Sequence, residues 1–202
     1  KLAIALADKR EAGAKSLKAG VEKELKELHM NGVRFGVQFS YPQDPEGFVE
    51  YRKEKLKPTP LGLGTLEFLF SPNPGEDLRP LAKIASGGEL SRIMLALKSI
   101  LNEQDTIPVM IFDEVDAGIG GRVAEKVGDK LKKVAETKQV FCITHLPQIA
   151  GMASSHYRVE KHVQGKRTRS RIRQLEFEER VEEVARMSSG EKITDASLKH
   201  AR

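Results

Sequence analysis

Apolar residues recur at helical spacing in the first part of the chain. Leu17, Val21, Leu25 and Leu28 follow one another at intervals of four, four and three residues, in a proline-free segment rich in Ala, Lys, Glu and Leu. This spacing predicts a helix over residues 1–30 with a seam like that of a coiled coil. Two interpretations stay open: a helix packed against the domain, or the stub of a longer coiled-coil arm.

The pattern then changes to one of strands. Residues 33–39 alternate apolar and polar side chains, as a half-buried strand does, and a second strand is expected at 66–70. The charged stretch 42–60, punctuated by prolines, is expected to be a connection between them. The Ser-Pro-Asn-Pro-Gly sequence at 71–75 is expected to break regular structure.

From residue 86 onward the pattern is typical of an α/β fold. Two short apolar runs, 109–112 and 140–144, predict buried strands, and helices are expected at 88–102 and 121–136. Because a helix separates the two strands, we expect a parallel pair joined by a crossover. Further along, we expect a hairpin turning near Gly165 and two helices, at residues 157–175, 178–187 and 194–202.

Composition narrows the class of protein only slightly. With 202 residues, 39% of them hydrophobic and 31% charged, we expect one compact domain with an appendage. Because Lys1 lies inside a helical pattern, we expect an internal segment of a longer protein. The single cysteine, Cys142, excludes a disulfide framework and favours a buried thiol in a reducing, cytoplasmic setting.

The net charge of +5 is concentrated in one segment. Between His156 and Arg173 lie seven Lys or Arg residues and one acid, so this stretch carries +6 and the rest of the chain −1. Arg167, Arg169, Arg171 and Arg173 alternate, which would place them on one face of a strand. They fit either a solvated edge strand whose charges prevent aggregation or a contact with nucleic acid.

Three short segments carry residues suited to nucleotide chemistry. The first is Ser86-Gly87-Gly88-Glu89. A serine followed three residues later by a glutamate is a capping box, which starts a helix without any ligand. The two glycines add bare backbone N–H groups that can approach a phosphate at a helix N-terminus.

The second and third segments end the two apolar runs. Asp113 and Glu114 follow 109–112, and open α/β sheets bind ligands at this carboxyl edge. One carboxylate can hold Mg²⁺ while its neighbour orients or deprotonates a water. His145 follows 140–144 at the same edge, within reach of a terminal phosphate. Structural explanations also exist: the two acids can simply start a turn, and a lone histidine at such a position is more often structural.

The order and spacing of these segments are more specific than any one of them. Roughly 25 residues separate the glycines from the acid pair, and about 30 separate the acids from the histidine. The phosphate loop G-x-x-x-x-G-K-[ST] does not occur in the sequence. The chain therefore carries a catalytic carboxylate pair without a phosphate cradle of its own, which is half of an active site.

The segments together resemble the RecN family of bacterial DNA-repair proteins, which are SMC-like ATPases of the ABC type. The resemblance runs over nearly the whole chain and is carried by PLAKIASGGELSR at 80–92, IFDEVDAGIGG at 111–121 and THLPQ at 144–148. Transporter ATPases differ, because their signature usually begins with Leu where Ala85 stands, and their loop after the acids usually ends in Asp.

The resemblance implies an α/β fold: the C-terminal lobe of an ABC/SMC-type ATPase head, with a P-loop NTPase-like parallel sheet. Residues 1–30 would be the end of a coiled-coil arm and 31–202 the lobe. The complete cytoplasmic, nucleoid-associated protein would hydrolyse ATP with Mg²⁺ between two heads and couple this to DNA handling in double-strand-break repair and recombination. Its implied partners are the N-terminal Walker A half, a second copy bound through the heads, and DNA. The chain alone is expected to be inactive.

The resemblance also implies roles for matching residues. The signature residues, which contact the γ-phosphate of ATP held by a second head, would be Ser86, Gly87, Gly88 and Glu89. The remaining site residues would be Asp113 as the Walker B acid on Mg²⁺, Glu114 as the general base, Asp116 and Gly118 in the loop that communicates across the head dimer, and His145 as the switch histidine. The alternatives are a non-catalytic, SMC-like structural or DNA-bridging module and, more weakly, a transporter-type ABC ATPase fragment.

Overall fold

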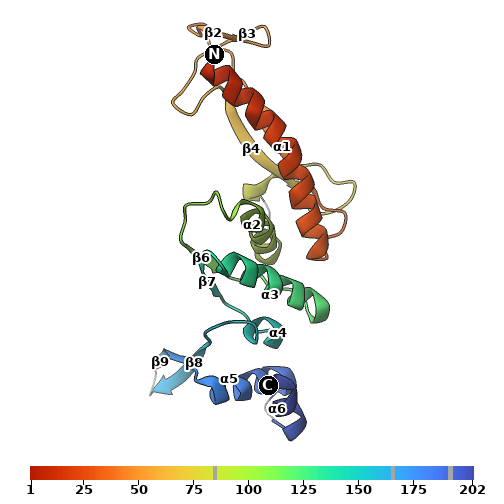
Figure 1. Cartoon of the computed structure of the whole chain (residues 1–202), viewed down its shortest axis with the longest axis vertical. Coiled ribbons are helices and arrows are strands. Elements are labelled where there is room, and N and C mark those ends of the chain that lie inside the picture. Colours follow the sequence, from red (N-terminus) through yellow and green to blue (C-terminus); the bar gives the residue numbers. More distant parts are fainter. Residues whose placement is uncertain (84–85, 165–166, 191–192) are drawn as a thin grey trace. The chain divides into compact units, whose positions relative to one another are not determined.

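The computed structural model describes residues 1–83, 86–164, 167–190 and 193–202. The chain divides into two compact units, residues 1–100 and 101–202, and each is described by itself (Figure 1). No helix in the described part of the chain is both long and apolar enough to cross a membrane.

The first unit joins a long helix to small antiparallel sheets. Its elements are α1 (Leu2–Glu27), β1 (Arg34–Ser40), β2 (Val49–Tyr51), β3 (Glu54–Leu56), β4 (Thr65–Ser71), β5 (Arg79–Pro80), the 3-10 helix η1 (Leu81–Lys83) and α2 (Gly87–Leu101), whose last residue passes the unit boundary. The strands β1, β4 and β5 form one antiparallel sheet in the order β1-β4-β5. The expected helix and the two expected strands are therefore confirmed.

The apolar seam of α1 builds the core of this unit. Val21, Leu25 and Leu28 are buried, together with Phe35 of β1 and Phe70 of β4. With 26 residues the helix is about 39 Å long at ~1.5 Å per residue. Within the first unit α1 is thus a helix packed against a sheet, and a continuation into a coiled-coil arm stays a prediction.

A short hairpin, β2–β3, lies where the sequence predicts only a connection. Its strands bury Tyr51 and Leu56 in a cluster with residues of α1. The turn between them places Arg52 and Lys53 at positive φ, 55° and 71°, without the Asn-Gly pair that usually allows this. The side chain of Arg52 fixes the turn, because its guanidinium lies 5.1 Å from the Tyr51 ring centre and pairs with Glu11.

The second unit begins with a parallel strand pair. Its elements are β6 (Val109–Phe112), α3 (Gly121–Ala135), β7 (Gln139–Cys142), α4 (Pro147–Ala150), β8 (Tyr157–Gln164), β9 (Arg167–Gln174), α5 (Phe177–Ser189) and α6 (Asp195–Ala201). The strands β6 and β7 pair in parallel and α3 connects them, which confirms the predicted crossover. The hairpin β8–β9 and the two final helices are also confirmed, although the predicted turn at Gly165 lies outside the described residues.

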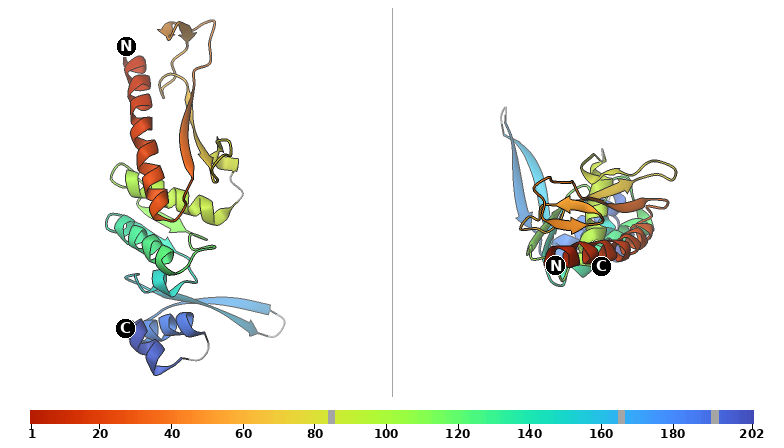
Figure 2. Two further views of the ribbon diagram at one scale, coloured as in Figure 1. Left: turned by 90° about the vertical axis from the view of Figure 1, so that its right-hand side faces the viewer. Right: turned by 90° about the horizontal axis from the view of Figure 1, so that it is seen from above.

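The prediction that β6 and β7 are buried strands is wrong for one face of the pair. Met110 and Phe112 are buried, whereas Ile111 on the opposite face is 69% exposed. Its neighbours on that face are exposed as well: Val109, Phe141 and Ile143. Figure 2 shows α3 against one side of the two strands. Helix α3 contacts β7, while the opposite face of the pair, which a parallel sheet ordinarily also covers, is exposed.

Candidate active site

The segment Ser86-Gly87-Gly88-Glu89 begins helix α2 in the first unit. The Ser86 hydroxyl accepts a hydrogen bond from the backbone N–H of Glu89 at 3.4 Å, and the Ser86 carbonyl accepts one from Leu90 at 3.0 Å. Ser86 therefore caps the helix, although its side-chain bond is long. Ser86 and Gly87 are exposed and Gly88 is buried. The variant signature position Ala85 lies outside the described residues.

The predicted acid pair occupies a tight turn at the end of β6, in the second unit. Both Asp113 and Glu114 are exposed, and the backbone N–H of Glu114 donates to the Asp113 carboxylate at 2.8 Å. Glu114 has a φ of 57°, in the left-handed region that a side chain other than glycine rarely adopts. Such backbone strain is concentrated at functional sites, where the surrounding structure must hold it in place. Here the Glu114 carbonyl accepts from Ala117 at 3.0 Å, which closes the turn.

Asp116 lies at the centre of this site. Its side chain is buried, with a relative exposure of 3% for the whole residue. One carboxylate oxygen, Oδ2, accepts from the Thr144 hydroxyl at 2.5 Å and from the His145 backbone N–H at 2.9 Å. The same oxygen lies 3.0 Å from Nδ1 of the His145 ring. The loop after β6 is thereby tied to the loop after β7.

This contact fixes which nitrogen of His145 faces solvent. A carboxylate accepts hydrogen bonds but donates none, so a carboxylate oxygen 3.0 Å from Nδ1 favours the ring form that carries a proton on that nitrogen. The other nitrogen, Nε2, is left to interact outside, on a side chain that is 70% exposed. In a neutral ring Nε2 can accept a proton from water, whereas in a charged ring it can donate to an anion such as a phosphate.

Thr144 is a site residue that the sequence analysis missed. Its hydroxyl donates to Asp116 and accepts from the backbone N–H of Leu146 at 3.0 Å. The available signal was local: a threonine whose hydroxyl bonds the backbone two residues later is a recognised turn motif, and a Leu-Pro pair follows it here. Thr144 therefore shapes the loop that presents His145.

Two further residues of this region behave differently. Gly118 is exposed, with a φ of 71° that favours glycine, and a side chain added there would meet nothing within 4 Å. Its predicted role in the loop that communicates across a head dimer stays a prediction. The Cys142 thiol at the end of β7 is half-buried, and burial followed by the charges of Asp116 and Asp113 raises its pKa to about 12. The sequence predicts a buried thiol, whereas the structure leaves it half-buried; its raised pKa keeps it protonated at neutral pH.

The donor set suits magnesium only in combination with a nucleotide. In the described residues no group of three His, Cys, Asp or Glu side chains could hold a metal ion by itself. Asp113 offers an exposed carboxylate at the strand end. Mg²⁺ is commonly held by one or two carboxylates, several waters and substrate phosphates, so Asp113 fits the protein's share of such a site.

Comparison with solved structures defines the class of fold. The SMC head domain with coiled coil and joint from Pyrococcus yayanosii matches with a TM-score of 0.55 and 18% identity, over 89% of this chain and 30% of that one. The SMC head domain with extended coiled coil from Pyrococcus furiosus matches with a TM-score of 0.51 and 17% identity, over 87% and 38%. The chain has a mixed α/β fold resembling part of an SMC head.

Comparison of sequences is more specific. No family model matches the chain. The DNA repair protein RecN of Bacillus subtilis is 41% identical over 195 residues, which are 96% of this chain and 34% of that protein. The RecN protein of Treponema pallidum is 45% identical over 197 residues, 98% of this chain and 33% of its relative. The resemblance to RecN is confirmed, and the chain spans about a third of the length of the curated relatives it matches.

Proposed function

We propose that the chain is the C-terminal lobe of a RecN-type ATPase head, with residues 1–30 as the end of a coiled-coil arm and 31–202 as the lobe. The observation that carries this proposal is the contact between Asp116 and His145. It joins the histidine to the loop that holds Asp113 and Glu114, at the edge where parallel strands bind ligands. Helix capping and turn formation alone do not require a buried carboxylate there.

In the proposed reaction each side chain has a distinct task. Asp113 would hold Mg²⁺ together with phosphate oxygens, and the ion would neutralise charge on the phosphates. Glu114, exposed beside it, would accept a proton from the attacking water. His145 would present Nε2 toward the terminal phosphate, in the orientation that Asp116 fixes.

The remaining parts of the site would come from other chain segments. The sequence lacks a phosphate loop, and the matched relatives are about three times longer. The exposed apolar face of β6–β7, with Ile111 at 69% exposure, is the kind of surface that an N-terminal Walker A half would cover. Ser86, Gly87 and Gly88 would then serve a second copy, by contacting the γ-phosphate held by its head.

In the complete protein this cycle would be coupled to DNA handling in double-strand-break repair and recombination, in the cytoplasm at the nucleoid. The alternative is a non-catalytic, SMC-like structural module with the same fold. Glu114 favours the catalytic function, because a head that only bridges DNA has no need of an exposed carboxylate in a strained backbone conformation. A transporter-type ATPase is the weaker alternative, because the matching sequences are RecN proteins.

The proposal is tested by ATP hydrolysis with and without the missing half. The chain alone should not hydrolyse ATP, because the backbone cradle and lysine for the phosphates are absent. When the chain is joined to a segment that carries the phosphate loop, the complete protein should hydrolyse ATP. Glu114→Gln should then keep ATP binding and reduce turnover about 10²–10⁴-fold. Glu125→Gln, an exposed glutamate on α3, is the matched control.

Two outcomes would contradict the proposal. ATP hydrolysis by the purified chain alone would show that it does not carry merely half of an active site. Near-normal turnover by Glu114→Gln with ATP bound would assign the base to another group, with His145 the first to be tested.

A further inference from the structure

The hairpin β8–β9 has two faces of different chemistry. Residues that pair across an antiparallel ribbon share a face, and Glu160 pairs with Arg171 while His162 pairs with Arg169. We call this side the basic face; the ladder places on it Arg158, Glu160, His162 and Gln164 of β8 and Arg167, Arg169, Arg171 and Arg173 of β9. The opposite face carries exposed apolar residues, among them Val163 and Ile172 at 77% and 68% exposure.

Acidic partners neutralise only the part of the basic face beside α5. Arg173 pairs with Glu179 at 2.5 Å, and Arg158 pairs with Glu183 at 3.3 Å. Glu160, the one acid on the face, is 3.2 Å from Arg158 and 3.3 Å from His162. These acids therefore compensate the arginines at the base of the ribbon.

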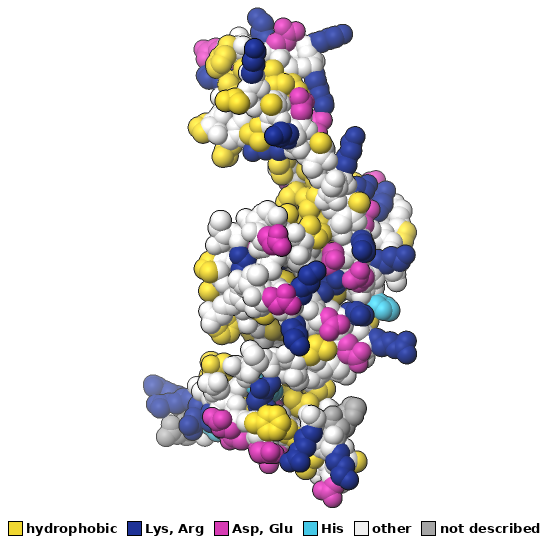
Figure 3. Space-filling view, in the orientation of Figure 1, with side chains coloured by type: hydrophobic (Ala, Val, Ile, Leu, Met, Phe, Trp, Pro, Cys, Tyr) yellow, Lys and Arg dark blue, Asp and Glu magenta, His cyan; other side chains and the backbone are white. Residues whose placement is uncertain are grey.

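The other half of the face keeps most of its charge, because Glu160 lies opposite Arg171 in the ladder whereas Arg169 lies opposite His162. Arg167, Arg169 and Arg171 are exposed, and no ion pair to them is found within the described residues. Figure 3 shows Lys and Arg side chains gathered at the end of the ribbon away from α5. Neighbours two apart on a strand are about 6.7 Å apart, which is inside the ~8 Å screening length at physiological salt. The three cations repel one another, and a polyanion would relieve that repulsion.

We propose that Arg167, Arg169 and Arg171 form a contact surface for the phosphodiester backbone of duplex DNA. The three side chains span about 13 Å of strand, and the same length of DNA duplex axis carries roughly four phosphates of one DNA strand at ~3.4 Å of axis each. Guanidinium groups suit phosphate oxygens because their planar donors can bind two oxygens at once.

The composition of the face favours duplex over single-stranded nucleic acid. Its described residues include no Phe, Tyr or Trp side chain on which an unpaired base could stack; the one ring among them is the imidazole of His162, which is held by Glu160, and Tyr157 lies on the opposite face. Contacts from these arginines would therefore be to phosphates and largely independent of base sequence. The inference rests on the proposed function only for its partner, DNA, and needs neither ATP nor a second head.

The test measures binding of the full chain to a fluorescent 30-base-pair duplex of mixed sequence, without nucleotide, at several salt concentrations. Changing all three arginines to glutamine should weaken binding on the order of 10²-fold at 0.15 M salt and flatten the slope of log K against log salt by about 2.7, or 0.9 per lost contact. Changing all three to lysine keeps the charge and should preserve the slope.

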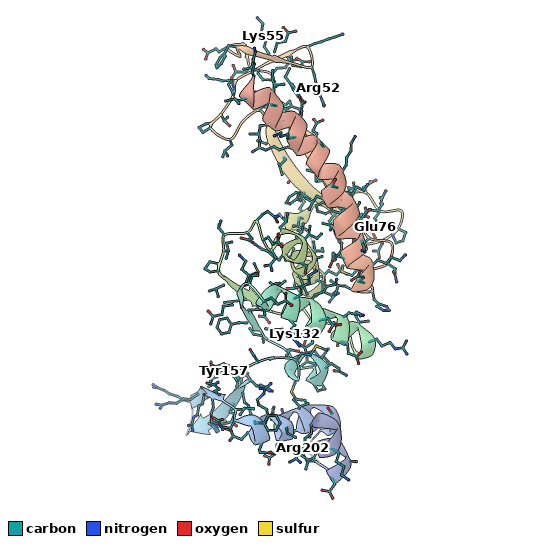
Figure 4. The ribbon with its side chains drawn as sticks, in the orientation of Figure 1. Arg52, Lys55, Glu76, Lys132, Tyr157 and Arg202 are labelled. Atoms are coloured by element: carbon teal, nitrogen blue, oxygen red, sulfur yellow. The ribbon has the colours of Figure 1, made fainter. Side chains whose placement is uncertain are left out.

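A control of equal charge separates a site from net charge. Lys126, Lys132 and Lys133 are exposed on α3 in the same unit, and Lys132 is marked in Figure 4. Their triple change to glutamine should reduce affinity less than threefold. Equal losses in both glutamine variants would overturn the proposal, as would an unchanged slope in the arginine variant. Circular dichroism and melting temperature verify folding, and if the triple glutamine variant unfolds, the single change Arg169→Gln should still flatten the slope by about 0.9.

Two more outcomes decide between partners. If polyglutamate or anionic lipid vesicles bind the chain as tightly as the duplex, with the same dependence on the three arginines, the DNA assignment is overturned. If the duplex does not bind at all, the surface proposal fails, while ATP hydrolysis by the completed protein would still support the proposed ATPase. The two failures are thus distinguishable.

Discussion

Loss of the Asp116 carboxylate should destabilise the two loops of the candidate site, because this side chain ties them together. Its buried carboxylate accepts from Thr144 and from the His145 backbone, and hydrogen bonds to a charged group contribute about 1.5–3 kcal/mol each. The His145 ring is 70% exposed, so its contact adds little to stability. Asp116→Ala should therefore lower the free energy of unfolding by about 3–5 kcal/mol, and Asp116→Asn, which keeps the shape and one acceptor, by roughly 1–3 kcal/mol.

The measurement is urea-induced unfolding of the wild-type chain and the two variants, followed by circular dichroism. Asp129→Asn provides the control, because Asp129 on α3 is 58% exposed and only forms an ion pair of 3.7 Å with Lys126. That change should remain within about 0.5 kcal/mol of wild type. If Asp116→Ala is no more destabilising than the control, the hydrogen bonds to Asp116 do not hold the two loops together.

A second readout separates positioning from stability. Long-range ¹⁵N–¹H spectra should show Nδ1 of His145 protonated in the wild-type chain, since that nitrogen faces the carboxylate. Asp116→Asn should allow both neutral forms of the ring, because an amide can turn either its oxygen or its NH₂ group toward Nδ1. In the completed ATPase the folded Asp116→Asn protein should lose hydrolysis while retaining Glu114. Unchanged ring protonation and full specific activity would refute the positioning role.

Three further predictions concern other residues. Ser86→Arg should leave ATP binding to each completed head intact and abolish the ATP-dependent dimers seen by mass measurement. Because the hydrogen bond to Glu89 is 3.4 Å long, losing the helix cap should lower stability by only about 0.5 kcal/mol. An unchanged dimer with a lowered melting temperature would instead show that Ser86 serves only as a cap. Cys142, whose pKa burial raises to about 12, should be alkylated at pH 8 about 10³-fold more slowly in the folded than in the urea-unfolded chain; equal labelling by mass spectrometry would contradict its burial. The pKa of Glu183 is lowered chiefly by its hydrogen bond from Arg186, so its contribution to stability should be present above about pH 5 and lost as the pH falls through the lowered pKa. Glu183→Gln should therefore flatten the acid side of a plot of unfolding free energy against pH. An unaltered plot would show that the Glu183–Arg186 pair does not stabilise the fold.

The sequence predicts the elements of this fold where a periodic pattern is long, and fails where the cause lies elsewhere in the molecule. The helix at the start and the β6–α3–β7 crossover follow from spacing alone. The hairpin β2–β3 does not, because its strands have three residues each and its turn relies on the contacts of Arg52 with a tyrosine ring and a glutamate. The exposed face of β6–β7 was also mispredicted, since an apolar run indicates that a face needs cover without indicating which segment supplies it.

The candidate site shows the same division between what is local and what depends on register. Asp113 and Glu114 were predicted because they end an apolar strand, a fact written in consecutive residues. The contact of Asp116 with His145 requires knowing that Phe112 pairs with Cys142, since that register brings the fourth residue after one strand beside the third residue after the other. A slip of the pairing by one residue would move the histidine about 3.3 Å along the sheet and break the contact. The sequence therefore names the chemical groups, whereas the parallel pairing decides that the buried acid orients the histidine.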